Sequence, residues 1–340
     1  MKAKVEGGYD HNRQKLADIV PLDAPFTVFI ASTQICNFRC FYCTHSHKGE
    51  DNIHLHAVHM EDATFEAVVN QLQKFPKVGR ILFTGLGEPL ANPKIPSMIH
   101  RLKQVGVTDR IEIVTNASLL THEMTDRLLD AGLTYLRVSL QGLSSEKYQE
   151  VAGVFLDFNK LVDNIRYFYE KKDDCKLYVK IMDACLESPE DEQIFYKIFG
   201  DISDQVYVEH IVKAQPQMLD QYSKNVTSER TFFNEPAEPR RICPFLFYTL
   251  QIDADGNVFP CPPLGFPESF SLGHVHSTTL HDIWFGEKLY DLQMLHLNGR
   301  RSQHPVCGNC QNYLCFTPEE DNLDLSADEI RKRLEARGHV

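Results

Sequence analysis

Three closely spaced cysteines constrain this chain more than any other feature of its sequence. Cys36, Cys40 and Cys43 have the spacing C-x-x-x-C-x-x-C, and Tyr42 directly precedes the third cysteine. Thiolates are the usual ligands of iron–sulfur clusters, and a four-iron cluster normally takes four of them. Three cysteines on one loop can therefore hold three irons and leave the fourth open to a small chelating ligand. A tetrahedral zinc site, which also uses closely spaced cysteines, is the alternative.

A second set of four cysteines lies near the C-terminus, at Cys243, Cys261, Cys307 and Cys310. An Asp-Gly-Asn turn at 255–257, flanked by apolar residues, predicts a β-hairpin between the first two of them. Four cysteines in two groups suit a structural zinc ion as well as a cluster. Spacing alone leaves both open.

Bulk composition limits the classes of function. The chain has 340 residues, 43% of them hydrophobic, and a formal charge of −12. A protein that binds nucleic acid generally has a basic surface, so a nucleic-acid partner is not expected. Residues 1–24 contain no signal-peptide pattern and no segment is long and apolar enough for a membrane span, so we expect a cytoplasmic protein without membrane contact. Cytosolic thiols stay reduced, which favours ligand or reactive cysteines over disulfides.

Strand and helix patterns alternate from residue 25 to about residue 215. Strands are expected at 25–34, 80–84, 111–115, 135–140, 177–182 and 206–211, and helices at 61–75, 94–105, 121–131, 158–170 and 189–199. Such alternation is typical of βαβ units around a parallel sheet. Six units are fewer than the eight of a closed barrel. The sequence therefore predicts an α/β fold, a partial (β/α)6 barrel of the TIM type, with its active site at the C-terminal ends of the strands.

The same patterns divide the chain into segments. We expect an N-terminal segment (1–24), the partial barrel (25–215), a linker (216–242), a small cysteine-rich domain (243–316) and a C-terminal helix (317–340). In the last segment, Ser326 and Glu329 have the spacing of a capping box.

The first cysteine triplet, with Tyr42 before its third member, resembles the signature of the radical S-adenosylmethionine (SAM) enzymes. In that family SAM chelates the open iron of a [4Fe–4S] cluster and is cleaved reductively to a 5′-deoxyadenosyl radical. The radical then abstracts a hydrogen atom from the substrate. The resemblance implies both cofactors and an electron donor such as flavodoxin or ferredoxin.

Other positions extend this resemblance. Gly85, Gly87 and Glu88 follow the second strand; glycines let backbone approach a ligand, and a carboxylate can accept from an ammonium group. This turn resembles the family's G-G-E-P turn, which holds the SAM amino group, with Leu86 as the departure. Further SAM contacts are expected at the ends of the third and fourth strands, from Asn116, Ser139 and Gln141.

The C-terminal pattern C-x12-G-x4-C, followed by C-x-x-C, resembles the SPASM/twitch extension of radical SAM enzymes. The resemblance implies a second, auxiliary [4Fe–4S] cluster held by Cys243, Cys261, Cys307 and Cys310.

The sequence says less about the reaction than about the family that the chain resembles. Few residues precede the triplet, so we expect a sugar-like or nucleotide-sugar small molecule, oxidised or epimerised at carbon, rather than a peptide. Peptide maturation and a non-catalytic iron–sulfur or zinc protein are the alternatives. Cys185 and Cys315 are candidate catalytic thiols that return a hydrogen atom, although they and Cys175 also fit a purely structural role. The histidine-rich loop 45–59 suits metal binding, acid–base chemistry or simple solvation.

Overall fold

The computed structural model describes residues 1–10, 13–46, 57–212, 229–262 and 267–338. Its central element is a ten-stranded sheet in the order β1-β7-β6-β5-β4-β3-β2-β8-β9-β10. The strands from β2 to β7 are all parallel. They span Thr27–Ile30 (β2), Arg80–Phe83 (β3), Ile111–Thr115 (β4), Tyr135–Leu140 (β5), Lys176–Met182 (β6) and Gln205–Glu209 (β7). The predicted partial (β/α)6 barrel is confirmed.

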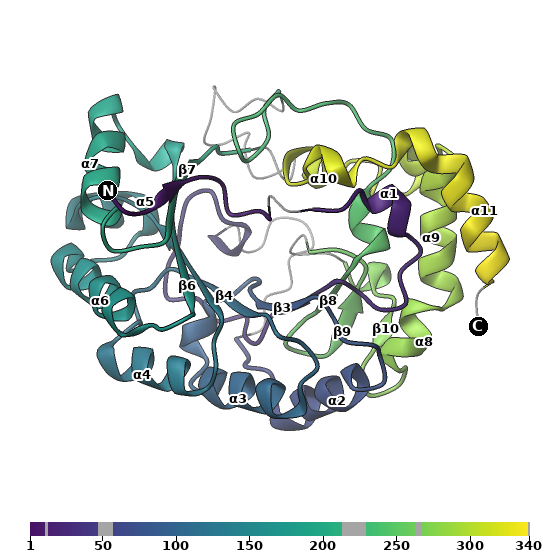
Figure 1. The fold of residues 1–340 in the computed structure, drawn as a ribbon, viewed down its shortest axis with the longest axis horizontal. Helices are drawn as coiled ribbons and strands as arrows, with labels where there is room; N and C mark the ends of the chain where they lie inside the picture. The colour runs from purple at the N-terminus through teal and green to yellow at the C-terminus, as the bar shows by residue number, and fades with distance from the viewer. Residues whose placement is uncertain (11–12, 47–56, 213–228, 263–266, 339–340) are drawn as a thin grey trace.

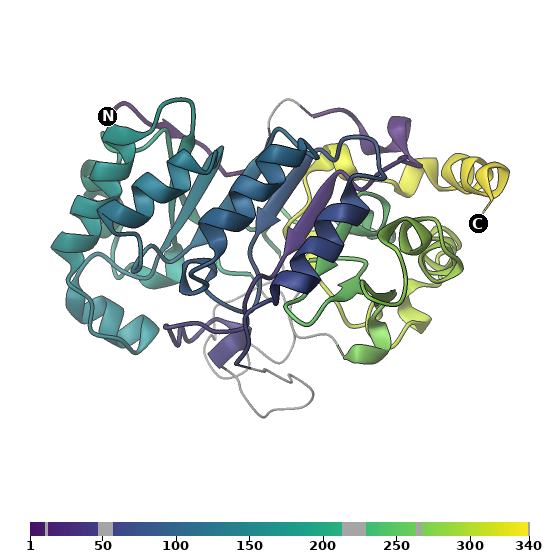
Figure 2. The same cartoon turned by 90° about the horizontal axis from the view of Figure 1, so that it is seen from below.

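Helices cover the convex side of this curved sheet, as Figure 1 shows. The predicted ones are α2 (Asp62–Leu72), α3 (Ile95–Val105), α4 (His122–Asp130), α6 (Phe158–Lys171) and α7 (Pro189–Phe199). Helix α5 (Ser145–Ala152) is not among the predicted ones, because its eight residues are mostly polar. Figure 2 shows the helices in front of the strands and running roughly along them.

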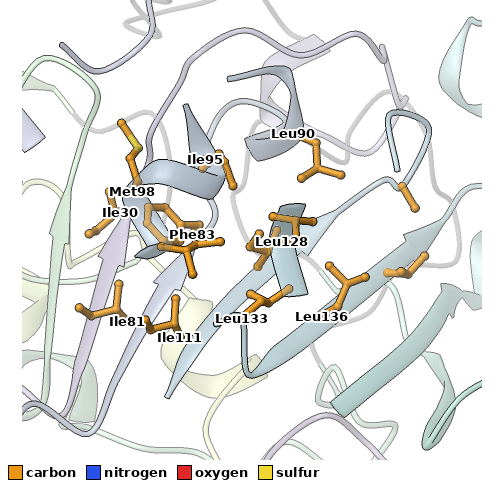
Figure 3. Packing of buried hydrophobic residues seen from close by; sticks show 14 of the residues in the cluster. Ile30, Ile81, Phe83, Leu90, Ile95, Met98, Ile111, Leu128, Leu133 and Leu136 are labelled. Carbon is orange, nitrogen blue, oxygen red and sulfur yellow. The ribbon is translucent and has the colours of Figure 1, made fainter. Parts of the chain in front are cut away.

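An apolar layer joins the helices to the sheet. Phe83 of β3 lies next to Ile95 and Met98 of α3 in Figure 3, and all three side chains are buried. Burying one large apolar side chain stabilises a fold by roughly 1.5–3 kcal/mol. This layer fixes the strands whose C-terminal ends carry the candidate site.

Both edges of the barrel sheet are extended. At one edge β1 (Lys4–Val5) pairs in parallel with β7. At the other edge β8 (Thr249–Ile252) pairs in parallel with β2, and β9 (Asn257–Phe259) and β10 (Gly273–His274) continue the sheet antiparallel. The β8–β9 hairpin predicted from the sequence is therefore present, and it shares a hydrogen-bonded ladder with the barrel.

Helices α8 (Leu280–Trp284), α9 (Glu287–Leu297) and α11 (Ala327–Arg337) lie at the right of Figure 1, beside this extension. The short helix α10 (Asn312–Cys315) lies nearer the middle, above the barrel. The C-terminal helix is where the sequence places it, but the capping box is wrong. Ser326 has φ −106° and ψ 11°, and its side chain makes no capping hydrogen bond. Arg333 and Arg337 anchor α11 instead, by donating to carbonyl oxygens of Val20 and Leu22.

The N-terminal segment runs from β1 along the open side of the barrel to α1 (Leu16–Ile19), as the purple trace in Figure 1 shows. Arg137 donates to the Gly8 carbonyl oxygen, and Arg110 pairs with Asp10 at 2.7 Å. This segment therefore forms part of the barrel wall. Within the described residues, none of the helices combines the length and the apolar character that crossing a bilayer requires.

Candidate active site

The cysteine triplet follows β2 directly and is held by backbone hydrogen bonds. Cys43 N donates to the Cys40 carbonyl at 3.0 Å and closes a turn. Arg39 N and Phe41 N donate to carbonyl oxygens of α5, at 2.8 and 3.1 Å. The loop that α5 supports therefore lies at the C-terminal end of the parallel strands, as expected.

The chemistry of the three thiols fits a cluster. Burial raises the pKa of Cys36 to about 11, and burial also raises the pKa values of Cys40 and Cys43. Negative charge adds to two of these shifts: the Glu88 carboxylate and the Cys43 thiolate raise the pKa of Cys36, and the Cys43 and Cys36 thiolates raise the pKa of Cys40. Ionising all three is unfavourable without a cation, and metal binding supplies one while it releases the protons. None of the ten cysteines, all of which lie within the described residues, forms a disulfide.

The turn after β3 packs directly on the chain that leads into the triplet. Glu88 N donates to the Ile35 carbonyl at 2.9 Å. A Cβ atom at Gly87 would lie 2.4 Å from the Thr33 carbonyl oxygen, and one at Gly85 would lie 2.5 Å from the Ala31 Cβ. Both glycines are required because the two segments approach so closely.

The Glu88 carboxylate is buried and joins this turn to the end of β4. Its Oε1 accepts from Leu90 N at 3.0 Å and from the Thr115 hydroxyl at 2.5 Å, and its Oε2 accepts from Asn116 N at 2.7 Å. Burial raises the pKa of Glu88, while these donors act in the opposite direction. Three donors from the chain already hold the carboxylate, so it acts at least as the support of the turn.

The other residues expected to contact SAM also gather around the cysteine loop. Asn116 Nδ2 donates to Asn37 Oδ1, inside the loop, at 3.0 Å. Gln141 Nε2 donates to the Ser139 carbonyl at 2.9 Å and lies 3.4 Å from the Tyr42 hydroxyl. Positions from β4, β5 and the loop are thus brought to one end of the sheet. Their contact with SAM stays a prediction.

A cavity of about 460 Å³ lies inside the barrel. Tyr42 and Cys43 line it from the cysteine loop, and Phe245, Pro262 and Asn312 line it from the C-terminal region. It therefore extends from the first cysteine set towards the part of the chain that carries the second.

The wall formed by β6 and β7 carries a buried ion pair. Lys180 Nζ lies 2.6 Å from Glu209 Oε2, and the Tyr178 hydroxyl donates to Glu209 Oε1 at 3.0 Å. Burial raises the pKa of Glu209, and the charge of Lys180 opposes that shift. Lys180 Nζ also lies 4.9 Å from the centre of the Phe232 ring. The sequence analysis did not single out Glu209.

A second charged group lies in the same barrel interior. Glu112 of β4 is fully buried among three guanidinium groups, those of Arg80, Arg110 and Arg137. Burial alone would raise the pKa of Glu112, but the three cations outweigh it and hold that pKa below its ordinary value. Arg80 and Arg137 line the cavity.

Segments outside the barrel strands also line the cavity. Tyr9, Asp10 and Arg13 come from the N-terminal segment, and Phe232 and Phe233 come from within the stretch predicted as a linker. No local pattern marks these positions, because only the closure of the fold brings them to the site.

The two candidate catalytic thiols are buried. Cys185 follows β6 in a 3-10 turn, and burial raises its pKa to about 12. Cys315 is fully buried and packs with Val212 and Phe232. Neither is among the described residues that line the cavity, and Cys175 is buried as well. Hydrogen-atom return by Cys185 or Cys315 stays a prediction.

Of the histidine-rich loop, His45 and His59 are described. His45 Nε2 lies 3.1 Å from the Gln34 carbonyl oxygen, and His59 Nδ1 lies 2.8 Å from the Thr33 hydroxyl. Both fasten the loop to the residues before the triplet. The predictions for His47, His54 and His56 fall outside the described residues.

The four C-terminal cysteines line one small cavity whose walls are mainly apolar. They share it with Phe245, Leu246, Phe270, His296, Arg301, Val306, Asn312 and Tyr313. Burial raises the pKa of Cys307 to about 12, and it also raises the pKa values of Cys243 and Cys261. Four cysteine side chains around an apolar space suit a metal cluster, because metal ions favour thiolate ligands.

The loop between Cys307 and Cys310 is fixed in place. Cys307 N donates to His304 Nδ1 at 3.2 Å, and Arg301 donates to the Cys310 carbonyl at 3.2 Å. A Cβ atom at Gly308 would lie 2.8 Å from the His304 carbonyl oxygen. His296, His304 and Arg301 are not predicted from the sequence, because no spacing rule connects them to the cysteines.

Two segments of the chain match known families. Residues 30–184 match the radical SAM superfamily, and residues 243–311 match the SPASM iron–sulfur cluster-binding domain. The probable GTP 3′,8-cyclase of Metallosphaera sedula is 32% identical over 125 residues, 37% of either chain. The first curated relatives are each matched over 34% to 41% of their own length.

Solved structures show the same fold. BtrN, in complex with AdoMet and 2-DOIA, is similar with a TM-score of 0.53 and 19% identity, over 87% of this chain and 96% of BtrN. Streptococcus suis SuiB, bound to the precursor peptide SuiA, is similar with a TM-score of 0.60 and 17% identity, over 88% of this chain and 73% of SuiB.

The matched segments contain the two cysteine sets, in the order that the sequence predicts. The cofactors of this chain are a [4Fe–4S] cluster with SAM and auxiliary iron–sulfur cluster chemistry. Their ligation by the triplet and by the C-terminal cysteines stays a prediction. The chain belongs to the radical SAM enzymes and carries a C-terminal SPASM iron–sulfur cluster-binding domain.

Proposed function

We propose that this enzyme oxidises or epimerises a carbon of a sugar-like or nucleotide-sugar small molecule. The observation that carries the proposal is the cavity itself. Its wall includes Lys180, Glu209, Arg137 and Tyr9, so charged and hydroxyl groups line a space of about 460 Å³ next to the cysteine loop. Such a wall suits a substrate with many hydroxyl groups, each of which needs a hydrogen-bond partner when buried.

When bound, the triplet cluster and SAM supply a 5′-deoxyadenosyl radical that removes a hydrogen atom from a substrate carbon. The chain's own residues hold that carbon in place and keep water away. Tyr42 and Phe232 provide apolar surface, and the Lys180 ammonium is placed to donate to a substrate hydroxyl.

Glu209 has the properties of a proton acceptor in this scheme. It is buried, its pKa is raised by burial, and it lies on the cavity wall. A carboxylate with a raised pKa takes a proton from a bound hydroxyl more readily than an ordinary one. Oxidation of a carbinol carbon requires the loss of such a proton.

We further propose that one auxiliary [4Fe–4S] cluster occupies the four-cysteine cavity and that flavodoxin or ferredoxin delivers the first electron, in a cytoplasmic setting. Peptide maturation is the second candidate, because SuiB, which shares the fold, is described with a precursor peptide. The charged cavity wall favours the small molecule.

The test is a substrate screen with anaerobically reconstituted enzyme, reductant and SAM. Sugars, aminocyclitols and nucleotide sugars are compared with peptides for their ability to raise 5′-deoxyadenosine formation. We expect a polyhydroxylated compound to do so. Its product will be two mass units lighter after oxidation, or will carry one solvent deuterium after epimerisation in deuterated water. Stimulation by peptides alone would overturn the proposal, as would the absence of any SAM cleavage.

A further inference from the structure

His296 lies near the end of α9 and lines the same cavity as the four C-terminal cysteines. Its side chain is completely buried. No metal-binding pattern in the sequence includes it. Its position beside four candidate ligands raises the question of what its ring does there.

The hydrogen bonds of the ring settle its protonation. Cys243 N donates to His296 Nδ1 at 3.2 Å, so Nδ1 carries a lone pair. The proton of a neutral imidazole must then be on Nε2. An Nε2 that bears a proton cannot ligate iron, but it can donate a hydrogen bond.

This donor has no acceptor within the described part of the chain. Nε2 is buried and makes no hydrogen bond there. Buried donors without a partner are rare in folded proteins, and an unfilled ligand site is one of the reasons for them. Other polar groups of the cavity have partners in the protein: Arg301 donates to the Cys310 carbonyl, and the Tyr313 hydroxyl donates to the Arg240 carbonyl.

We propose that His296 donates a hydrogen bond from Nε2 to a sulfur atom of the auxiliary cluster, either a sulfide or a cysteine thiolate, and thereby raises the reduction potential of that cluster. The inference rests on the proposal that the four cysteines hold a cluster. Hydrogen bonds to sulfur are one of the factors that set cluster potentials. Donation stabilises the reduced form more, because that form carries more negative charge. A higher potential makes the cluster a better acceptor for the electron that an oxidation leaves on the substrate.

The test uses the full chain with Cys36, Cys40 and Cys43 all changed to alanine, so that only the auxiliary cluster is assembled. In this background, His296→Asn keeps an oxygen near the Nδ1 position for Cys243 N but loses the donor. His296→Gln is the matched control, because its terminal amide N–H lies near the position of Nε2. Midpoint potentials are measured by redox titration followed by electron paramagnetic resonance.

We expect about four irons per chain in each protein, at four irons per [4Fe–4S] cluster. The Asn variant should show about a tenfold smaller equilibrium constant for reduction, which is about 59 mV for a one-electron couple. The Gln variant should stay closer to the parent. Equal potentials in the parent and the Asn variant would overturn the proposal.

A second measurement needs no variant at His296. With 15N-histidine in the parent, pulsed resonance should detect a weak nitrogen coupling transmitted through the hydrogen bond. A strong coupling, which signals direct ligation, or no coupling would overturn the proposal. Absence of any iron in the parent would instead remove the auxiliary cluster, so the two failures are distinguishable.

Discussion

Lys180 on β6 and Glu209 on β7 form an ion pair inside the barrel, with 2.6 Å between Nζ and Oε2. The Glu209 side chain is only 3% exposed, and both residues line the central cavity. A buried ion pair is weak support for stability, since desolvation offsets its attraction. Its position on the cavity wall points to substrate binding as its role.

Lys180→Met should therefore impair turnover of the substrate. The change leaves Glu209 buried without its cation, and we expect a loss of stability of about 3–5 kcal/mol. The double variant Lys180→Met with Glu209→Gln removes both charges and should recover much of that stability. It should not recover the 5′-deoxyadenosine formation that substrate stimulates. We expect that rate to fall about tenfold or more, because a loss of about 1.4 kcal/mol of transition-state binding lowers a rate tenfold. Recovery of activity together with stability would contradict a role in binding.

Glu88→Ala should weaken SAM binding while the cluster iron is retained. The change leaves Leu90 N and Asn116 N without their buried acceptor, at a cost of about 1–3 kcal/mol. Equilibrium titration with SAM, alongside iron analysis, measures both quantities. Thr115→Val is the matched control, because it removes one donor and leaves the carboxylate in place. Unchanged SAM affinity in the Ala variant would remove Glu88 from the site.

Glu112→Gln should destabilise the barrel in a pH-dependent way. At neutral pH the change removes the buried anion that three guanidinium groups share, although Arg110 keeps its partner Asp10, and we expect a cost of about 3–5 kcal/mol. The folded-state pKa of Glu112 is lowered, so its stabilisation is complete above the unfolded-state pKa and is lost as the pH falls through the folded-state pKa.

Urea unfolding followed by circular dichroism, at equal cluster loading, measures this prediction. The difference between the wild type and the Gln variant should be largest near pH 7 and should shrink in acid, where a protonated glutamate resembles glutamine. A difference that is constant with pH would contradict the charge argument.

Iron analysis after anaerobic reconstitution tests the two cysteine sets together. The wild type should bind about eight irons, and the variant with Cys36, Cys40 and Cys43 changed to alanine should bind about four, at four per cluster. Cys175→Ala, at a buried thiol outside both sets, should keep about eight. If the wild type instead binds about four irons and the triple variant binds none, and both retain one zinc, the C-terminal site is structural.

The sequence predicts most of the barrel because its signals are local. Strand β4 (Ile111–Thr115) and helix α7 (Pro189–Phe199) have the bounds read from their apolar patterns. The cysteine spacings are also local signals, because they predict cluster or metal binding without any knowledge of the fold. One local signal was missed. Glu112 is a charged residue within an otherwise apolar strand, and this pattern indicates a side chain that faces the barrel interior.

Long-range relationships could not be predicted. Arg13 and Asp321 form an ion pair although they lie near opposite ends of the sequence. Tyr9 reaches the cavity only because β1 joins the far edge of the sheet. His296 is separated by 53 positions from Cys243, whose amide fixes its ring. Such contacts result from how the strands and helices pack together. That packing leaves no recognisable pattern in the sequence around either residue.

The pairing of β8 with β2 makes one continuous ladder of the strands that carry the two cysteine sets. Thr27 is opposite Thr249 and Ile30 is opposite Ile252, in parallel register. A change in the separation of the two sites would require this ladder to slip or break, and a slip of one residue would turn buried side chains outward. The separation of these two strands is therefore a dimension of the sheet, fixed as the chain folds.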